Sequence, residues 1–281
     1  MKIVTNFEDL QFALQDLRRP LGFVPTMGYL HEGHLSLVRK ARNENESTVV
    51  SIFTNPTQFA PEEDLSNYPT DIDRDQKHLR AEKVDLVWIP PVDLMYHENF
   101  QTWVSVKNLG RLLEGKYRPT HFQGVTTIVS KLFNAVQPER AYFGQKDAQQ
   151  ARIIQQMVSD LNYPIEIIVC PIVREGDGLA LSSRNSYLGE NERIAAVCLS
   201  RGLFKARDAF AGGEKNVEKL KEIVLREINQ EGLANVQYVS CAHPVSLEEL
   251  SGNNESCLIS LAVFIGKTRL IDNIILPEPV S

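Results

Sequence analysis

The chain has 281 residues, which is enough for one large domain or two modest ones. Its content of 43% hydrophobic and 23% charged residues is ordinary for a globular protein and argues against a disordered chain. Acidic residues outnumber basic ones by 36 to 30, so the formal charge is −6 and we expect no nucleic-acid partner.

Two features of the sequence bear on where the protein works. No apolar run reaches the length of about 18 residues that a membrane span needs. The first residues, MKIVTNFEDLQFAL, carry acids where a signal peptide has an apolar core. We therefore expect no membrane association and a cytoplasmic localisation.

The cysteines form no CxxC pair, and none has a histidine at zinc-site spacing. They are Cys170, Cys198, Cys241 and Cys257. Isolated cysteines in apolar stretches, such as the one in IEIIVC, are usually small buried hydrophobic residues. We predict buried thiols in a reduced compartment and no metal site built on cysteine.

The first part of the chain alternates short apolar runs with helical patterns. Strands are predicted at 21–24, 48–53, 84–89, 140–143 and 165–169, and helical segments at 35–41, 75–83, 124–136 and 148–160. Strands that alternate with helices of about 10–15 residues indicate βαβ units and a parallel sheet. Continuously apolar strands are typical of a sheet covered on both faces. We therefore predict an α/β fold with a Rossmann-like N-terminal domain over residues 1–174.

The pattern changes after this point. Residues 176–186 are polar and glycine-rich, and helical stretches follow at 190–211 and 216–230. Strands are predicted near 236–241, 257–264 and 268–275. We predict a smaller α+β C-terminal domain over residues 175–281 that closes over the site.

The segment PTMGYLHEGH joins the first predicted sheet strand to a helix. His31 and His34 are three residues apart, so they share one face of the first helical turn, and Gly33 between them allows a ligand close to the backbone. A helix N-terminus is a natural phosphate site. The alternatives are a metal site, although the HExxH signal needs histidines four apart, and an exposed helix start with incidental histidines.

Three further loops carry polar residues suited to small anionic ligands. They are Asn55–Phe59 after a strand, Gly144–Asp147 after another strand, and Leu181–Asn185 between the domains. Each alone is also explained by an ordinary turn, helix cap or polar linker. Ligands of parallel sheets bind beyond the carboxyl ends of the strands, so their joint placement favours phosphoryl chemistry on a nucleotide.

Missing motifs narrow the chemistry. The sequence has no GxxxxGK[ST] phosphate loop, no GxGxxG fingerprint and no GxSxG around a serine. Among enzymes that act on nucleotides, the main alternative is a cytidylyl- or adenylyltransferase for a phosphorylated small molecule. Such an enzyme would need additional basic residues to bind the phosphate of that molecule. A non-catalytic nucleotide-sensing module, which would bind ATP without turnover, is the alternative from a different class.

Five blocks of sequence resemble, in order, those of the pantothenate synthetase (pantoate–β-alanine ligase) family. They are PTMGYLHEGHLSLV, SIFTNPTQF, RPTHFQGV, FGQKDAQQ and VREGDGLALSSRNSYL, from Pro25 to Leu188. The first contains the HxGH signature of the nucleotidyltransferase superfamily. The resemblance implies ATP-dependent condensation of D-pantoate with β-alanine to pantothenate, AMP and pyrophosphate through a pantoyl-adenylate.

The resemblance also implies roles for individual residues. His34 would be the catalytic imidazole with His31 as its companion, and Lys146 and Arg184 would act on the phosphates. The ATP site would comprise Met27, Gly28, Tyr29, Leu30, His31, Glu32, Gly33, His34, Gly144, Gln145, Lys146, Asp147, Val173, Leu181, Ser182, Ser183 and Arg184. Gln58, Gln150 and Asn55 would hold pantoate, and Gln58 would also contact β-alanine.

The remaining expectations concern four residues that differ from the usual choices of the family, the metal ion and the oligomeric state. Tyr29 stands where the family usually has Ala, Leu181 where it usually has Met, and Thr54 and Thr57 replace common apolar choices. These changes affect local packing around the site. We expect no resident metal site; Mg²⁺ would come with ATP, held mainly by its phosphates, with Asp75 as an outer ligand. The resemblance implies a homodimer.

Overall fold

The computed structural model describes residues 1–59, 65 and 68–278. The chain forms two compact units. The first comprises Met1–Gln145 and Gln149–Pro171, and the second comprises Lys146–Ala148 and Ile172–Ser281. The tripeptide Lys146–Ala148 therefore groups with the second unit although its sequence neighbours belong to the first. The functional division at residue 174 stays a prediction.

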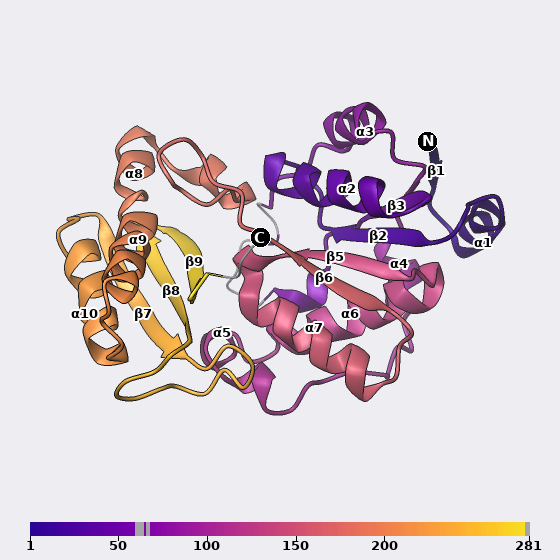
Figure 1. The fold of residues 1–281 in the computed structure, drawn as a ribbon. Helices are drawn as coiled ribbons and strands as arrows, with labels where there is room; N and C mark the ends of the chain where they lie inside the picture. The colour runs from indigo at the N-terminus through magenta and orange to yellow at the C-terminus, as the bar shows by residue number, and fades with distance from the viewer. Residues whose placement is uncertain (60–64, 66–67, 279–281) are drawn as a thin grey trace. The chain divides into compact units, whose positions relative to one another are not determined.

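Within the described residues of the first unit, a six-stranded parallel sheet has the order β1-β4-β3-β2-β5-β6 (Figure 1). The strands are β1 (Lys2–Val4), β2 (Leu21–Thr26), β3 (Ser47–Ile52), β4 (Leu86–Trp88), β5 (Arg140–Gly144) and β6 (Glu166–Cys170). The strand order reverses between β2 and β5, which pair directly. Ligands of open α/β sheets bind at such a reversal, beyond the carboxyl ends of the strands. The predicted α/β parallel fold is confirmed.

Helices cover both faces of this sheet. The α-helices in the described part of the chain up to residue 160 are α1 (Phe7–Gln15), α2 (Glu32–Glu44), α3 (Ile72–Ala81), α4 (Val92–Met95), α5 (Glu114–Tyr117), α6 (His121–Val136) and α7 (Ala148–Asp160). Successive strand residues face opposite sides, so Phe23 belongs to the core cluster with α1, α6 and α7, and Val24 to the one with α2 and α3. Both faces are therefore buried, as the continuously apolar strands predict.

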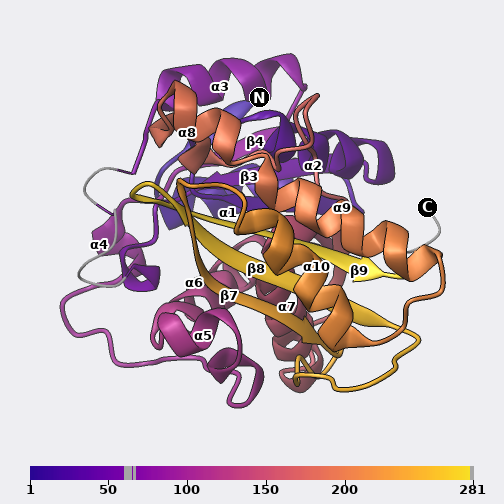
Figure 2. The same cartoon turned by 90° about the vertical axis from the view of Figure 1, so that its left-hand side faces the viewer.

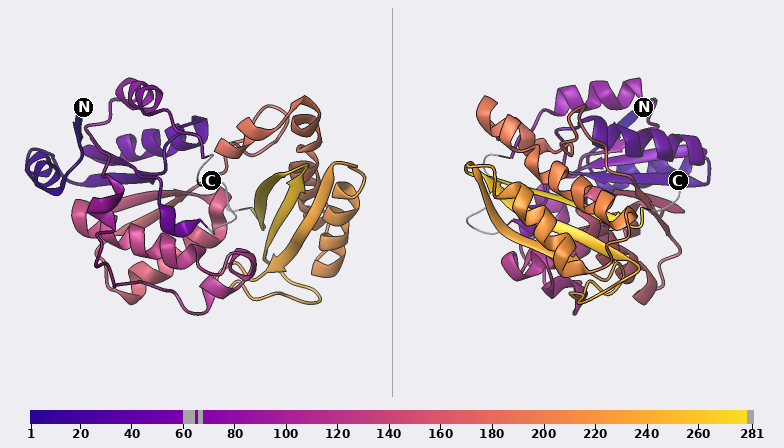
Figure 3. Two further views of the ribbon diagram at one scale, coloured as in Figure 1. Left: turned by 180° about the vertical axis from the view of Figure 1, so that it is seen from behind. Right: turned by 60° about the vertical axis from the view of Figure 1, so that its left-hand side comes forward.

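The second unit is a small α+β unit. It contains η5 (Ser183–Tyr187), α8 (Glu190–Ala195), α9 (Cys198–Ala211), α10 (Val217–Ile228), β7 (Ala234–Ala242), β8 (Cys257–Ile265) and β9 (Thr268–Leu276). Among its described residues the three strands form an antiparallel sheet in the order β7-β8-β9. Figures 2 and 3 show α9 and α10 side by side along one face of this sheet, where they share its apolar core. The predicted α+β class is confirmed.

Two local differences from the sequence prediction have physical causes. The helical stretch predicted at 190–211 is divided into α8 and α9, because the backbone at Val197 and Leu199 makes tighter i→i−3 hydrogen bonds. The N-terminal β1 and α1 were not predicted. α1 begins at a side-chain cap, in which Asn6 accepts from the Asp9 N–H, and it buries only Leu10 and Ala13.

The structure also bears on the predictions about the cysteines and about membrane-spanning segments. All four cysteines lie in the described residues, where each is a free and buried thiol, as predicted. Burial raises the pKa of the Cys170 thiol to about 11. Among the described residues, no helix combines the length and the apolar character that crossing a bilayer requires.

Candidate active site

The HxGH loop leaves the carboxyl end of β2 through two residues in the left-handed region. Gly28 has φ +85°, and Tyr29 has φ +50°. A Cβ on Gly28 would lie 3.0 Å from Ile52 Cγ2 and 3.1 Å from Asp75 Oδ2, so both conformation and space favour glycine. Tyr29 incurs a steric penalty of about 1–2 kcal/mol in this conformation. Neighbouring contacts must therefore hold the turn.

Asp75 on α3 supplies those contacts. It is fully buried, and its two carboxylate oxygens accept the Tyr29 and Leu30 N–H groups, each at 2.7 Å. The neighbouring Arg74 donates to the Leu30 carbonyl at 3.0 Å, and its guanidinium lies 4.8 Å from the centre of the Tyr29 ring. Burial raises the pKa of Asp75, and the two N–H donors oppose that rise. The structure shows Asp75 bracing the loop, and its role as an outer magnesium ligand stays a prediction.

The paired histidines occupy the first turn of α2. His31 is the N-cap residue, and His34 is the third residue of the helix. The His31 N–H donates to Nδ1 of His34 at 3.4 Å, and the ring centres are 4.0 Å apart. Because Nδ1 of His34 accepts, a neutral ring carries its proton on Nε2 and is a donor there. The positive end of the 13-residue α2 lies at the same turn.

The loop after β3 is organised by Asn55. This side chain is 1% exposed, and its amide donates to Gln58 Oε1 and to the Gly124 carbonyl, each at 3.1 Å. Its Oδ1 accepts from the hydroxyls of Thr57 and Tyr96, each at 2.9 Å. Both amide hydrogens of Asn55 are thus used inside the protein. Asn55 orients Gln58 at the end of η1 (Pro56–Gln58).

The first two candidate loops contact each other directly. The Gln58 amide donates to Sδ of Met27 at 2.8 Å, and the Thr54 hydroxyl donates to the Met27 carbonyl at 3.2 Å. Thr54 therefore ties the segment after β3 to the HxGH loop by a hydrogen bond. The structure brings the HxGH loop and the Gln58 loop together, as their positions after neighbouring parallel strands predict.

The backbone of Gln58 is fixed by the start of α6. His121 Nδ1 donates to the Gln58 carbonyl at 2.8 Å, and Arg118 donates to the same oxygen at 3.3 Å. Arg118 also lies 3.3 Å from His121 Nε2, which selects the ring form with its proton on Nδ1. A Cβ on Gly124 would lie 2.5 Å from the Thr57 carbonyl oxygen, so only glycine allows α6 this close to η1.

Two adjacent glutamines on α7 have different surroundings. Gln149 is buried and donates to the carbonyls of Leu109 and Leu112 at 2.8 Å, while its own carbonyl accepts the Glu114 N–H at 3.0 Å. It braces the segment before α6. Gln150, which the resemblance makes a pantoate ligand, follows it and is half-buried.

Of the remaining predicted residues, Gly144 and Gln145 belong to the first unit, and Lys146, Asp147, Val173 and Leu181–Arg184 belong to the second. Ser182 caps η5 by accepting the Arg184 N–H at 3.3 Å, and Ser183 is buried. The Leu181 N–H donates to the Val173 carbonyl at 3.0 Å, which joins two residues predicted at the nucleotide. Lys146 in η4 (Gln145–Asp147) has an ammonium 3.7 Å from the Asp147 carboxylate.

Sequence reasoning missed several residues that shape these loops. They are Asp75 as a brace, Tyr96, His121, Gly124 and, in the second unit, Asn273. The RPTHFQGV block was recognised as part of the resemblance, but no role was assigned to its histidine or glycine. Tyr96 and Asn273 belong to no block, and neither had a signal in the sequence.

A parallel sheet with polar loops after its central strands, followed by a small antiparallel unit, defines a two-unit α/β protein. Comparison with known proteins specifies the family. The model of the pantoate-beta-alanine ligase family matches residues 2–275. The pantothenate synthetase of Pseudothermotoga lettingae is 49% identical over 280 residues, covering 99% of this chain and 100% of that protein. The chain belongs to the pantoate–β-alanine ligase family.

Solved structures agree with this assignment. The pantothenate synthetase from Thermus thermophilus has a TM-score of 0.93 and 43% identity, covering 98% of this chain and 99% of that one. A pantoate-beta-alanine ligase from Francisella tularensis, complexed with beta-gamma ATP and beta-alanine, has a TM-score of 0.82 and 36% identity, covering 98% of this chain and 97% of that one. The predicted family and fold are both confirmed.

Proposed function

We propose that this protein condenses D-pantoate with β-alanine, using ATP, to give pantothenate, AMP and pyrophosphate. The observation that carries the proposal is the contact between the HxGH loop and the Gln58 loop, where the Gln58 amide meets Met27 at 2.8 Å. A phosphate held at the start of α2 and a carboxylate held at Gln58 would then be neighbours. Such proximity is the main requirement for joining the two.

The reaction proceeds in two steps. A carboxylate oxygen of pantoate attacks the α-phosphorus of ATP, and the bond to the bridging oxygen of pyrophosphate breaks. The β-alanine amine then attacks the acyl carbon of pantoyl-adenylate, loses a proton, and expels AMP with the electrons of the acyl–oxygen bond. No covalent enzyme nucleophile is needed, so the protein acts by positioning and by stabilising charge.

The first unit supplies the pantoate contacts in this proposal. Gln58 holds pantoate and later β-alanine, because its amide can both donate and accept. Gln150 binds pantoate from α7, and Asn55 acts on pantoate by orienting Gln58. His34 donates from Nε2 to the charge that develops on the α-phosphate, with His31 beside it.

Residues grouped with the second unit supply positive charge. Lys146 and Arg184 stabilise the phosphates, with the hydroxyls of Ser182 and Ser183 as further donors. The remaining nucleotide contacts are Met27–Leu30, Glu32, Gly33, Gly144, Gln145, Asp147, Val173 and Leu181. In functional terms, residues 1–174 hold pantoate and begin the nucleotide site, and residues 175–281 complete it.

The substrates arrive as small molecules, and ATP brings Mg²⁺ with it. Asp75 is fully buried and its two oxygens accept backbone N–H groups of the HxGH loop, so we assign it a bracing role, and the ion is held mainly by phosphate oxygens. We further propose that the protein is a cytoplasmic homodimer and that it acts without a nucleic-acid or membrane partner.

The proposal is tested by incubating the protein with MgATP, pantoate and β-alanine and measuring all products. Pantothenate, AMP and pyrophosphate should form in equal amounts, and omission of pantoate should abolish all three. Formation of ADP and phosphate, or binding of ATP without turnover, would overturn the proposal. The second outcome is the one expected of a nucleotide-sensing module.

A further inference from the structure

Strand β9 of the second unit carries two buried polar residues in succession. Asp272 is 2% exposed and Asn273 is 3% exposed, within a strand whose Leu270, Ile274 and Leu276 pack into the apolar core. Buried polar groups are costly unless they are hydrogen-bonded. The contacts of this pair therefore show what it does.

Asp272 holds the turn that leads to the Ser182–Arg184 segment. Arg174 donates to its two oxygens at 2.6 Å and 2.9 Å in a planar fork, and also donates to the Gly178 carbonyl at 3.1 Å. The guanidinium lies 5.1 Å from the centre of the Phe204 ring, which fixes its plane. Arg174 also pairs with Ala180 across this turn, just before the predicted phosphate contacts begin.

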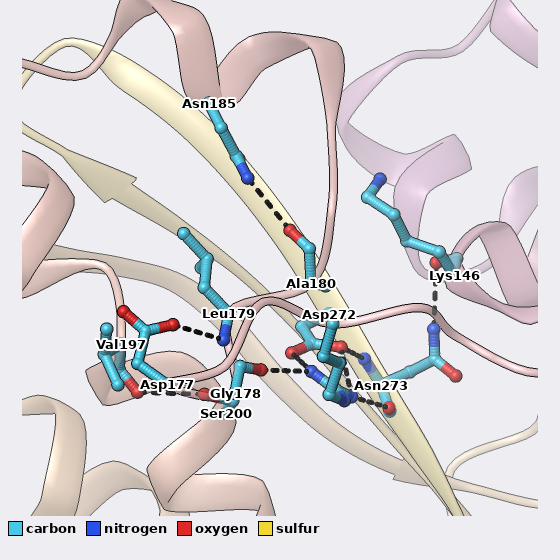
Figure 4. Close-up of polar contacts among 11 residues, drawn as sticks. Lys146, Asp177, Gly178, Leu179, Ala180, Asn185, Val197, Ser200, Asp272 and Asn273 are labelled. Atoms are coloured by element: carbon cyan, nitrogen blue, oxygen red, sulfur yellow. Dashed lines mark hydrogen bonds and ion pairs between the residues drawn. The ribbon is translucent and has the colours of Figure 1, made fainter. Parts of the chain in front are cut away.

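Asn273 holds the segment that carries Lys146. Its side-chain amide donates to the backbone carbonyl of Lys146 at 2.9 Å (Figure 4). This bond joins residues 127 positions apart in the sequence and fixes the peptide from which the Lys146 side chain extends. The Asn273 N–H in turn donates to Asp272 at 2.8 Å, so the two neighbours form one network.

We propose that the Asp272–Asn273 pair is a positioning element for the phosphate site. It holds the segment that carries Lys146 and the segment that carries Arg184 in fixed positions relative to each other. Asn273 orients Lys146, and Asp272 orients the turn before Arg184 through Arg174. All of these residues belong to one compact unit. The inference rests on the proposed function, because it assumes that Lys146 and Arg184 act on ATP phosphates.

A purely stabilising role explains the pair less well. Buried ion pairs are weak contributors to stability, and apolar side chains of similar size often replace them without loss. The Asn273 amide, in contrast, donates to the backbone carbonyl of Lys146 and so determines where the mobile, charged Lys146 side chain starts. An error of about 1 Å at a catalytic group costs about 10²-fold in rate, so this geometry matters for turnover.

The test removes the donor and keeps the fold. In Asn273→Ala, kcat for pantoate-dependent pyrophosphate release should fall by roughly 10–100-fold, with KM for ATP changed by less than about 3-fold. Asn273→Asp, which has nearly the same shape but no donor, should show a similar loss. It also provides the measurement if Asn273→Ala does not fold.

A matched control lies directly opposite on β8. Ser260 pairs with Asn273 in the sheet, is 8% exposed, and has no hydrogen-bond partner for its hydroxyl among the described residues. Ser260→Ala should leave kcat within about 2-fold of the parent, because it removes a buried polar atom of the same sheet without touching Lys146.

A double-mutant cycle separates positioning from general damage. If Asn273 acts through Lys146, adding Asn273→Ala to Lys146→Ala should cost less than about 2-fold more. A full additional loss in the double variant, or an unchanged kcat in both Asn273 variants, would overturn the inference. Absence of pantoate-dependent pyrophosphate release in the parent protein would instead reject the proposed function, so the two failures are distinguishable.

Discussion

Gly124 tests whether the position of Gln58 controls the chemistry. A Cβ at this site would lie 2.5 Å from the Thr57 carbonyl oxygen and 2.8 Å from the Gln58 nitrogen, and both are backbone atoms. Neither can move by a side-chain rotation. In Gly124→Ala, η1 and α6 must therefore separate.

The size of that shift follows from the contact distances. Ordinary contact begins near 3.4 Å, so the segments must move apart by about 0.9 Å. Crowding of this kind costs about 1–3 kcal/mol, and about 0.5–1 kcal/mol is recovered because alanine suits a helix better than glycine. The variant should therefore fold. A displacement near 1 Å at a substrate ligand should lower kcat/KM for pantoate by about 10²-fold, which is about 2.7 kcal/mol.

The assay follows pyrophosphate release against pantoate concentration at saturating ATP, beside a thermal melt. Gly110→Ala is the matched control, because its Cβ would meet only Phe122 at 3.7 Å, an ordinary contact. It should retain parental kinetics. A folded Gly124→Ala protein with normal kcat/KM for pantoate would refute the idea that this close approach places Gln58 for catalysis.

Three further predictions concern single residues. His34→Ala should lower the rate of adenylate formation by roughly 10²–10³ without unfolding the protein, and near-normal pyrophosphate release would remove His34 from the mechanism. Asp75→Asn leaves one backbone N–H of the HxGH loop without an acceptor, so a denaturation curve should show a loss of about 1–3 kcal/mol together with slower adenylate formation; an unchanged curve would contradict the bracing role. Lys205 and Arg201 lower the pKa of Glu227, so its contribution to stability is present above about pH 4.3 and is lost as pH falls through the lowered pKa. Glu227→Gln should therefore flatten the fall in unfolding free energy between about pH 5 and 3, and a parental slope would exclude this assignment.

Local patterns in the sequence predicted much of the fold. The helix at 148–160 is α7 with the same bounds, because Ala151, Ile154 and Val158 recur at helical spacing and are buried. The polar loops after β2 and β3 were found because glycine, proline and histidine interrupt apolar runs there. The same residues carried the resemblance that the comparisons confirm.

The missed features depend on contacts between residues far apart in the sequence. Tyr29 adopts φ +50° because Asp75, 46 residues later, accepts its N–H. Asn273 reaches Lys146 across 127 positions, and nothing in either segment indicates the partner. The break between α8 and α9 falls at Ala196 and Val197, and neither residue is a helix breaker.

The central claim is that pantoate is activated by attack of its carboxylate on the α-phosphorus of ATP. Pantoate labelled with ¹⁸O in both carboxylate oxygens, incubated with the protein, MgATP and β-alanine, tests this most directly. The account predicts one ¹⁸O atom in the phosphate of each AMP and one in the amide carbonyl of pantothenate. Unlabelled AMP, or label in released orthophosphate, would contradict it.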